Sequence, residues 1–220
     1  MTSQKPESIM TTHTRGSATI DQADGNVAES VHRAIDSQRE VDLKRTPFKD
    51  RQRALKNAYR EDGERAKQTT VVRSATPPDA ETGKVRIAVD GGAGTEFDIG
   101  AHVSVGGTDD TPCSGDVFLA SLAGCYEVTL RLVAAASKIT INRLDLRVEG
   151  DWDARGTLGI DRNVPVGYTD IRVIVDLDAD GPADRIAKLP ELTERYCVVS
   201  QTLKTPPTVA ISCNVARSES

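Results

Sequence analysis

The spacing of hydrophobic residues predicts one long helix near the middle of the chain, over residues 114–138. Its polar positions are few, and Glu127 and Arg131 are spaced to form an i, i+4 ion pair. Apolar residues cover most of the remaining circumference, and one stripe recurs at helical intervals: Phe118, Leu122, Cys125, Thr129, Leu132 and Ala136. A helix that is apolar on nearly every side belongs in the centre of a core.

Alternating apolar and polar residues predict strands on both sides of this helix. A meander is expected before it, at residues 69–75, 84–90, 95–99 and 102–105. The glycine-rich stretch 90–94 is interpreted as a hairpin turn and not as a phosphate-binding loop, because no helix follows it. Two longer strands are expected after the helix, at residues 139–149 and 167–177.

A second helical region is predicted from Gly181 and Pro182, restarting at Pro190 and running to about residue 204. Its apolar stripe consists of Leu192, Tyr196, Val199 and Leu203. A short strand at 208–213 is expected to close the sheet. Helices and antiparallel strands in this order indicate the α+β class, because parallel βαβ units would alternate regularly.

The first part of the chain is more polar. Residues 1–45 are interpreted as a largely disordered or weakly helical tail, residues 46–67 as a helical arm, and residues 68–220 as the folded domain. Thr46 is expected to cap the arm helix and Pro47 to be its first residue. The arm is basic between residues 39 and 67. This charge fits either a solvated face beside an acidic body or contact with RNA.

Composition narrows the function classes. The net charge of -5 among 220 residues gives no general attraction to nucleic acid. No apolar run approaches the roughly 20 residues that a bilayer span requires, and no secretory signal begins the chain. A cytoplasmic protein without nucleic-acid or membrane partners is expected. His13 and His32 lie in the polar segment and there is no CxxC motif, so neither a metal nor a cofactor is expected.

Cysteines carry the strongest chemical signal. Cys125 and Cys197 are far apart in sequence but each lies in an apolar helical pattern, a setting suited to dithiol redox chemistry. Cys113 and Cys213 are interpreted as packing thiols. Asp116 is either part of the active site or a favourable acid in the first helical turn behind a Ser114 cap.

Three segments resemble the OsmC/Ohr family: residues 116–125 with Cys125, residues 153–159, and residues 195–199 with Cys197. The resemblance covers about residues 69–215. It implies an OsmC-like fold, with antiparallel sheets around two central helices in an intertwined homodimer. It also implies thiol-dependent reduction of an organic hydroperoxide, with Cys125 as peroxidatic thiol, Cys197 as resolving thiol, and a dithiol reductant such as a lipoylated protein.

The chain departs from the peroxidase branch at one position. That branch has a glutamate ten residues before the peroxidatic cysteine, which holds an activating arginine, and this chain has Gly115 there. Asp116 matches the acid of a less characterised OsmC-like branch. Arg73 and Arg86 are both candidates for the activating cation. The alternative function is a non-catalytic dimeric protein that binds a hydrophobic small molecule.

Overall fold

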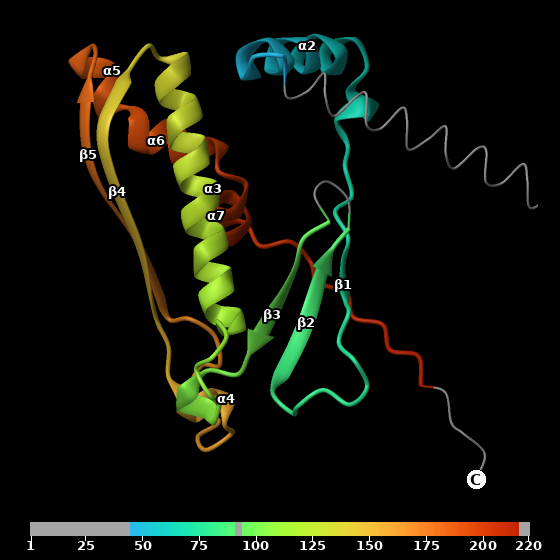
Figure 1. Cartoon of the computed structure of the whole chain (residues 1–220). Coiled ribbons are helices and arrows are strands. Elements are labelled where there is room, and N and C mark those ends of the chain that lie inside the picture. Colours follow the sequence, from blue (N-terminus) through green and yellow to red (C-terminus); the bar gives the residue numbers. More distant parts are fainter. Residues whose placement is uncertain (1–44, 91–93, 216–220) are drawn as a thin grey trace, which may run out of the picture. The chain divides into compact units, whose positions relative to one another are not determined.

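The computed structural model describes residues 45–90 and 94–215. The predicted tail and the weak helical pattern before residue 45 lie outside these residues. The chain divides into two compact units, Met1–Thr69 and Thr70–Ser220. Figure 1 labels the helices and strands along the chain.

The first unit contains a helix and one short turn of 3₁₀-helix, α2 (Phe48–Glu61) and η1 (Gly63–Ala66). The arm helix was therefore predicted correctly, but Pro47 is its N-cap and not its first residue. No side chain caps this end, so the predicted cap at Thr46 is wrong. None of the residues of α2 is buried.

The second unit begins with a three-stranded antiparallel sheet, which confirms three of the four predicted strands of the meander. Its strands are β1 (Val72–Ser74), β2 (Lys84–Val89) and β3 (Glu96–Gly100), in the order β1-β2-β3. The predicted turn joins β2 to β3, and its residues 91–93 lie outside the described part of the chain. Arg86 and Asp98 are cross-strand partners and form a two-pronged ion pair at 2.8 and 3.0 Å.

The fourth predicted strand of the meander, at 102–105, is wrong. Residues Val103–Val105 form the 3₁₀-helix η2. The His102 Nδ1 atom accepts a hydrogen bond from the Ser104 N–H at 3.0 Å and so caps this turn. Gly106 then ends it with a φ of 96°, a left-handed conformation that favours glycine. Two local caps thus override the alternating pattern.

The long helix is α3 (Ser114–Ala136), close to its predicted bounds. Its N-cap is Cys113, so the cap predicted at Ser114 is wrong by one residue. The Cys113 Sγ atom accepts from the Asp116 N–H at 3.4 Å, and the Asp116 carboxylate accepts from the Cys113 N–H at 3.0 Å. This reciprocal capping box fixes where α3 begins. The predicted Glu127–Arg131 ion pair is confirmed at 2.6 Å.

Two long antiparallel strands form the second sheet, β4 (Thr140–Asp151) and β5 (Asp170–Asp180), joined through the short helix α4 (Ala154–Thr157). At the α4 end of this sheet, Asp151 and Asp170 are directly opposed, an arrangement that repels. The Arg172 guanidinium donates to both carboxylates, at 2.6 and 2.5 Å, which offsets the repulsion. It also holds the pKa of the Asp151 carboxyl below its ordinary value.

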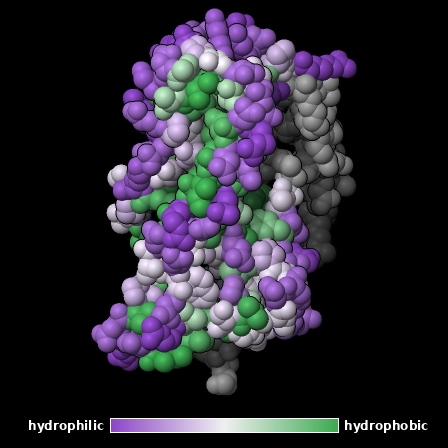
Figure 2. Space-filling model, turned by 90° about the vertical axis from the view of Figure 1, so that its left-hand side faces the viewer, coloured by the Kyte–Doolittle hydropathy of each residue, from purple (hydrophilic) through white to green (hydrophobic). Residues whose placement is uncertain are grey.

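The hydrophobic core lies between α3 and one face of the β4–β5 sheet. Leu122, Tyr126 and Leu130 of α3 are buried there with Cys197, and they pack against inward side chains of both strands. Figure 2 views the molecule from the β4–β5 side, where hydrophilic atoms cover much of the surface. The alternation of the strands thus separates an apolar inner face from a polar outer one.

The second helical region consists of three pieces, α5 (Ala183–Ala187), α6 (Leu189–Tyr196) and α7 (Val198–Lys204). The prediction that Cys197 lies in the middle of a helix is wrong. Its backbone is extended, with φ of -76° and ψ of 111°, and it ends α6 and begins α7. The Cys197 N–H donates to the Thr193 carbonyl at 2.9 Å, while its Sγ atom accepts from the Ser200 N–H at 3.5 Å.

The predicted last strand at 208–213 is also wrong. Residues 206–215 have no regular secondary structure, and Val209 and Ile211 are 80% and 92% exposed. An alternating pattern forms a strand only when a neighbouring edge supplies hydrogen bonds. No such partner for this segment lies among the described residues.

By length and composition, α3 could cross a membrane, which differs from the expectation that no segment could. One such helix is weak evidence, because the core helix of a soluble protein passes the same test. Several residues of α3 pack against the β4–β5 sheet and α6, as a core helix does.

Substitution Leu130→Ala is expected to destabilise the fold by about 2–5 kcal/mol, because Leu130 is 2% exposed and its truncation leaves a cavity. Leu158→Ala is the matched control, since Leu158 is 51% exposed and should cost less than about 0.5 kcal/mol. Urea unfolding of both variants measures the difference. Equal effects would mean that Leu130 is not in the core.

Candidate functional site

The structure brings the two predicted thiols together. Cys125 lies half-buried at the middle of α3, and Cys197, fully buried, lies at the junction of α6 and α7. Cys125 packs against the buried cluster that contains Cys197, and each thiol shifts the pKa of the other, although the two are far apart in the sequence. Both cysteines are free.

The break at Cys197 creates the environment of Cys125. Because Cys197 is extended, the chain turns before α7 and directs the first backbone N–H groups of that helix toward α3. The backbone N–H groups of Val198 and Val199 both lower the pKa of the Cys125 thiol. The Thr129 hydroxyl, one helical turn along α3, lowers the same pKa.

These donors decide the ionisation of Cys125. Burial alone would raise the pKa of its thiol, because a thiolate loses hydration in an apolar setting. The Val199 N–H, the Cys197 thiol, the Val198 N–H and the Thr129 hydroxyl favour the thiolate and together outweigh burial, so the pKa of Cys125 lies below its ordinary value. Cys125 is therefore the thiol that ionises first.

Cys197 has the opposite shift. Burial raises the pKa of its thiol; the Ser200 N–H lowers it, and the nearby Cys125 raises it further. The surroundings of Cys197 thus favour its protonated thiol. The pair consists of one thiolate former and one thiol, held in contact within an apolar core.

Substitution Thr129→Val is expected to raise the pKa of Cys125, because it removes a hydroxyl donor while keeping a β-branched side chain of similar size. Thr129→Ser, which keeps the hydroxyl, is the control and should leave the pKa near that of the parent. The rate of Cys125 alkylation as a function of pH measures both. An unchanged profile for Thr129→Val would mean that the hydroxyl does not stabilise the thiolate.

The other predicted site residues lie elsewhere. Asp116 caps the start of α3, about 14 Å from Cys125 along the helix axis at 1.5 Å per residue. Arg73 is paired with Asp90, and Arg86 with Asp98. No arginine is among the groups that shift the Cys125 pKa most strongly. The catalytic role of Asp116 and the choice of an activating arginine remain predictions.

Sequence reasoning missed three of the groups around Cys125. The Val198 and Val199 N–H groups had no sequence signal, because their direction depends on the backbone angles of Cys197. Thr129 does have a sequence signal, because it lies four residues after Cys125 on the same helix face. From the sequence alone it is assigned only to the apolar stripe. Over residues 45–90 and 94–215, no group of three or more His, Cys, Asp or Glu side chains is placed to hold a metal.

Comparison with known proteins gives a consistent result. The family model described as OsmC-like protein matches residues 107–212, which include both thiols. No curated protein sequence matches the chain. Similar solved structures are an OsmC-like protein from Mycoplasma pneumoniae (18% identity, 63% of this chain and 89% of that one, TM-score 0.49) and an OsmC-like protein of unknown function from Vibrio cholerae (12%, 63% and 96%, TM-score 0.51).

An organic hydroperoxide resistance protein OsmC from Legionella pneumophila is also similar, at 18% identity over 63% of this chain and 90% of that one, with a TM-score of 0.46. At these identities the likeness concerns the fold alone. The Vibrio cholerae structure supports the predicted fold class, in which antiparallel sheets surround a long helix and a second helical region.

Proposed function

We propose that this chain, which belongs to the OsmC/Ohr family of OsmC-like proteins, reduces organic hydroperoxides through the thiol pair Cys125 and Cys197. One observation carries the proposal: the two thiols pack together in the core, with the pKa of one lowered and that of the other raised. A peroxidatic thiol must be ionised to attack, and a resolving thiol must wait beside it.

In the first step the Cys125 thiolate attacks one oxygen of the hydroperoxide. Attack on the terminal oxygen breaks the O–O bond, and the sulfur takes up that oxygen with its hydrogen as a sulfenic acid. The other oxygen leaves with the bond electrons and takes a proton from water to give an alcohol. The Val198 and Val199 N–H groups stabilise the attacking thiolate, a part that an arginine plays in the peroxidase branch. Gly115 leaves the chain without that branch's glutamate, which fits placement in the less characterised branch.

In the second step the Cys197 sulfur attacks the sulfenic sulfur, water leaves, and a Cys125–Cys197 disulfide forms. The pKa of Cys197 is raised while Cys125 is a thiolate, so its thiol stays protonated until it is needed. A dithiol reductant, such as a lipoylated protein in the cytoplasm, then returns both sulfurs to thiols by exchange. Neither a metal nor a cofactor takes part in these steps, and no nucleic-acid or membrane partner is proposed.

Steady-state turnover tests this function. The full chain should consume tert-butyl hydroperoxide rapidly with a dithiol such as dihydrolipoamide and slowly with a monothiol, because a dithiol completes the exchange within one molecule. Saturable consumption that depends on the protein supports the proposal. Consumption no faster than that of the dithiol alone would contradict it and favour the non-catalytic alternative.

A homodimer is expected as the working form. Val128 of α3 is 59% exposed, and Tyr196 and Val198 near the thiol pair are 60% and 71% exposed. Apolar side chains gathered around a central helix indicate a surface that a second copy covers. Sedimentation should give about twice 23.6 kDa, and Val128→Asp should shift it toward the monomer. A stable monomer at micromolar concentration would contradict this expectation.

A further inference from the structure

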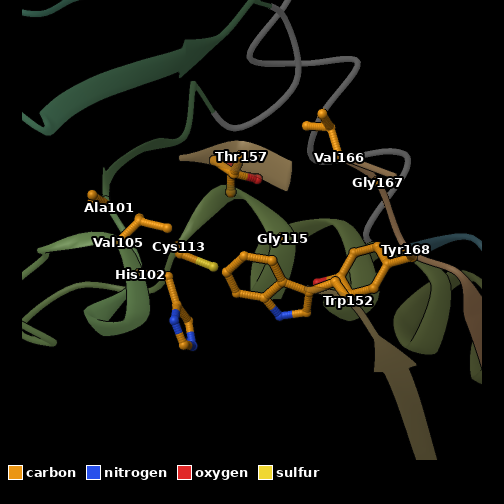
Figure 3. Close-up of a pocket in the computed structure, with 12 residues that line it drawn as sticks. Ala101, His102, Val105, Cys113, Gly115, Trp152, Thr157, Val166, Gly167 and Tyr168 are labelled. Carbon is orange, nitrogen blue, oxygen red and sulfur yellow. The ribbon is translucent and has the colours of Figure 1, made fainter. Parts of the chain in front are cut away.

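A cavity lies at the N-terminal end of α3, away from the thiol pair near the middle of that helix (Figure 3). It measures about 230 Å³ and is formed by η2, the first turn of α3 and the segment from Trp152 to Tyr168. Cys113 lines it, twelve residues before Cys125, which is about 18 Å along the helix axis. The cavity is therefore separate from the proposed redox site.

Aromatic rings form its walls. The His102 and Trp152 rings meet edge to face, with centroids 5.2 Å apart. The Tyr168 ring stacks on Phe118 with centroids 6.0 Å apart, which holds it at the side of the cavity. In Figure 3 the Cys113 sulfur and the Tyr168 hydroxyl both point toward the side where Trp152 lies.

Two glycines make this arrangement possible. A Cβ atom at Gly115 would lie 2.6 Å from the Tyr168 hydroxyl oxygen, and one at Gly150 would lie 2.7 Å from the Tyr168 ring. Any larger residue at either position would displace the tyrosine. The same Gly115 that departs from the peroxidase branch thus lets Tyr168 sit over the first turn of α3.

The lining is neutral. Among the described residues that line it there is no Asp, Glu, Lys or Arg. Its polar side chains besides the His102 and Trp152 rings carry a thiol and three hydroxyls, from Cys113, Ser114, Thr157 and Tyr168. His102 Nδ1 already accepts from the Ser104 N–H, so the imidazole proton lies on Nε2. Such walls exclude a charged ligand, because its charge would lose water without gaining a partner.

The size fits a single ring. A dry apolar cavity of about 150 Å³ holds benzene in another protein, and 230 Å³ adds room for a short polar substituent. We propose that this cavity binds a small, neutral, monocyclic aromatic molecule with one hydroxyl group. Its ring packs among Trp152, His102 and Tyr168, and its hydroxyl bonds to Thr157 or Tyr168.

Trp152 is the only tryptophan of the chain, so its fluorescence reports on this cavity alone. Titration of the full chain with benzyl alcohol, excited at the red edge of the indole band, is expected to give a saturable change in emission. Thr157→Phe places a ring in the cavity and should abolish the saturable change. Leu158→Phe, at the neighbouring exposed position outside the lining, should keep it.

Alkylation of cysteines gives a second readout that needs no variant. Saturating benzyl alcohol should slow the modification of Cys113 severalfold and leave that of the exposed Cys213 unchanged, as followed by peptide mass spectrometry. Non-saturating fluorescence, an equal response in Thr157→Phe, or unprotected Cys113 would overturn the proposal. Because neither readout uses Cys125 or a hydroperoxide, failure here is distinct from failure of the redox function.

Discussion

Cys125→Ser is expected to reduce hydroperoxide consumption to the rate of the reductant alone. A serine hydroxyl is not ionised near neutral pH and does not attack an O–O bond, so the first step is lost entirely. The change is nearly isosteric and the side chain is only half-buried, so the fold should persist. Turnover of tert-butyl hydroperoxide with dihydrolipoamide measures the loss, and the unfolding midpoint checks the fold.

Cys113→Ser is the matched control for this experiment. Cys113 lies directly before α3, and its sulfur caps that helix. Serine is a favoured N-cap residue, so the substitution should keep the cap. Activity should remain close to that of the parent. Full activity in Cys125→Ser, or loss of activity in Cys113→Ser, would show that Cys125 is not the peroxidatic thiol.

Cys197→Ser should permit about one turnover, whereas Cys125→Ser permits none. This holds when the reductant is a dithiol that reduces only disulfides. Cys125 can still attack the hydroperoxide, but no neighbouring thiol then condenses with the sulfenic acid. Serine can take over the N-cap of α7 from Cys197, because its oxygen accepts from the same Ser200 N–H. The substitution therefore removes the thiol but keeps the cap of α7.

Dimedone, which reacts with sulfenic acids, should label Cys125 in Cys197→Ser after one equivalent of hydroperoxide and label the parent far less. Intact-mass measurement gives the extent of labelling. Continued turnover at the parental rate in Cys197→Ser would show that Cys197 is not the resolving thiol, and the double variant Cys125→Ser with Cys197→Ser sets the background.

The main layers of the fold were predictable from local patterns. The apolar pattern predicted the position of α3, and alternation predicted β4 and β5, whose apolar side chains pack against α3 in the core. Hydrophobic periodicity determines which face an element buries, and it is visible in the sequence. The Glu127–Arg131 pair follows for the same reason, since its geometry is set within one helix.

The errors have a different physical origin. The turn at η2 and the break at Cys197 depend on single side chains that cap the backbone, His102 in one case and the cysteine itself in the other. The apolar stripe through Leu192, Tyr196 and Val199 continues across that break, so periodicity alone could not reveal it. The segment 208–213 has a strand pattern but no pairing partner within the described chain.

The candidate site was predictable only in part. Matching sequence settings indicated that Cys125 and Cys197 belong together, and the contact of their thiols agrees with that indication. The groups that lower the Cys125 pKa were not predictable, because two of them are backbone N–H groups whose positions follow from the fold. A cation near the Cys125 sulfur was expected from the sequence, whereas the groups that lower its pKa are uncharged.

The disulfide state of the protein after one equivalent of an organic hydroperoxide tests the central claim most directly. Peptide mapping without reduction should find one intramolecular bond between Cys125 and Cys197, with Cys113 and Cys213 still free. Because a disulfide needs Cα atoms about 4.4–6.8 Å apart, this bond also tests the crossing of α3 with the α6–α7 junction. Both thiols remaining reduced, or a bond that involves Cys113 or Cys213 instead, would contradict the account.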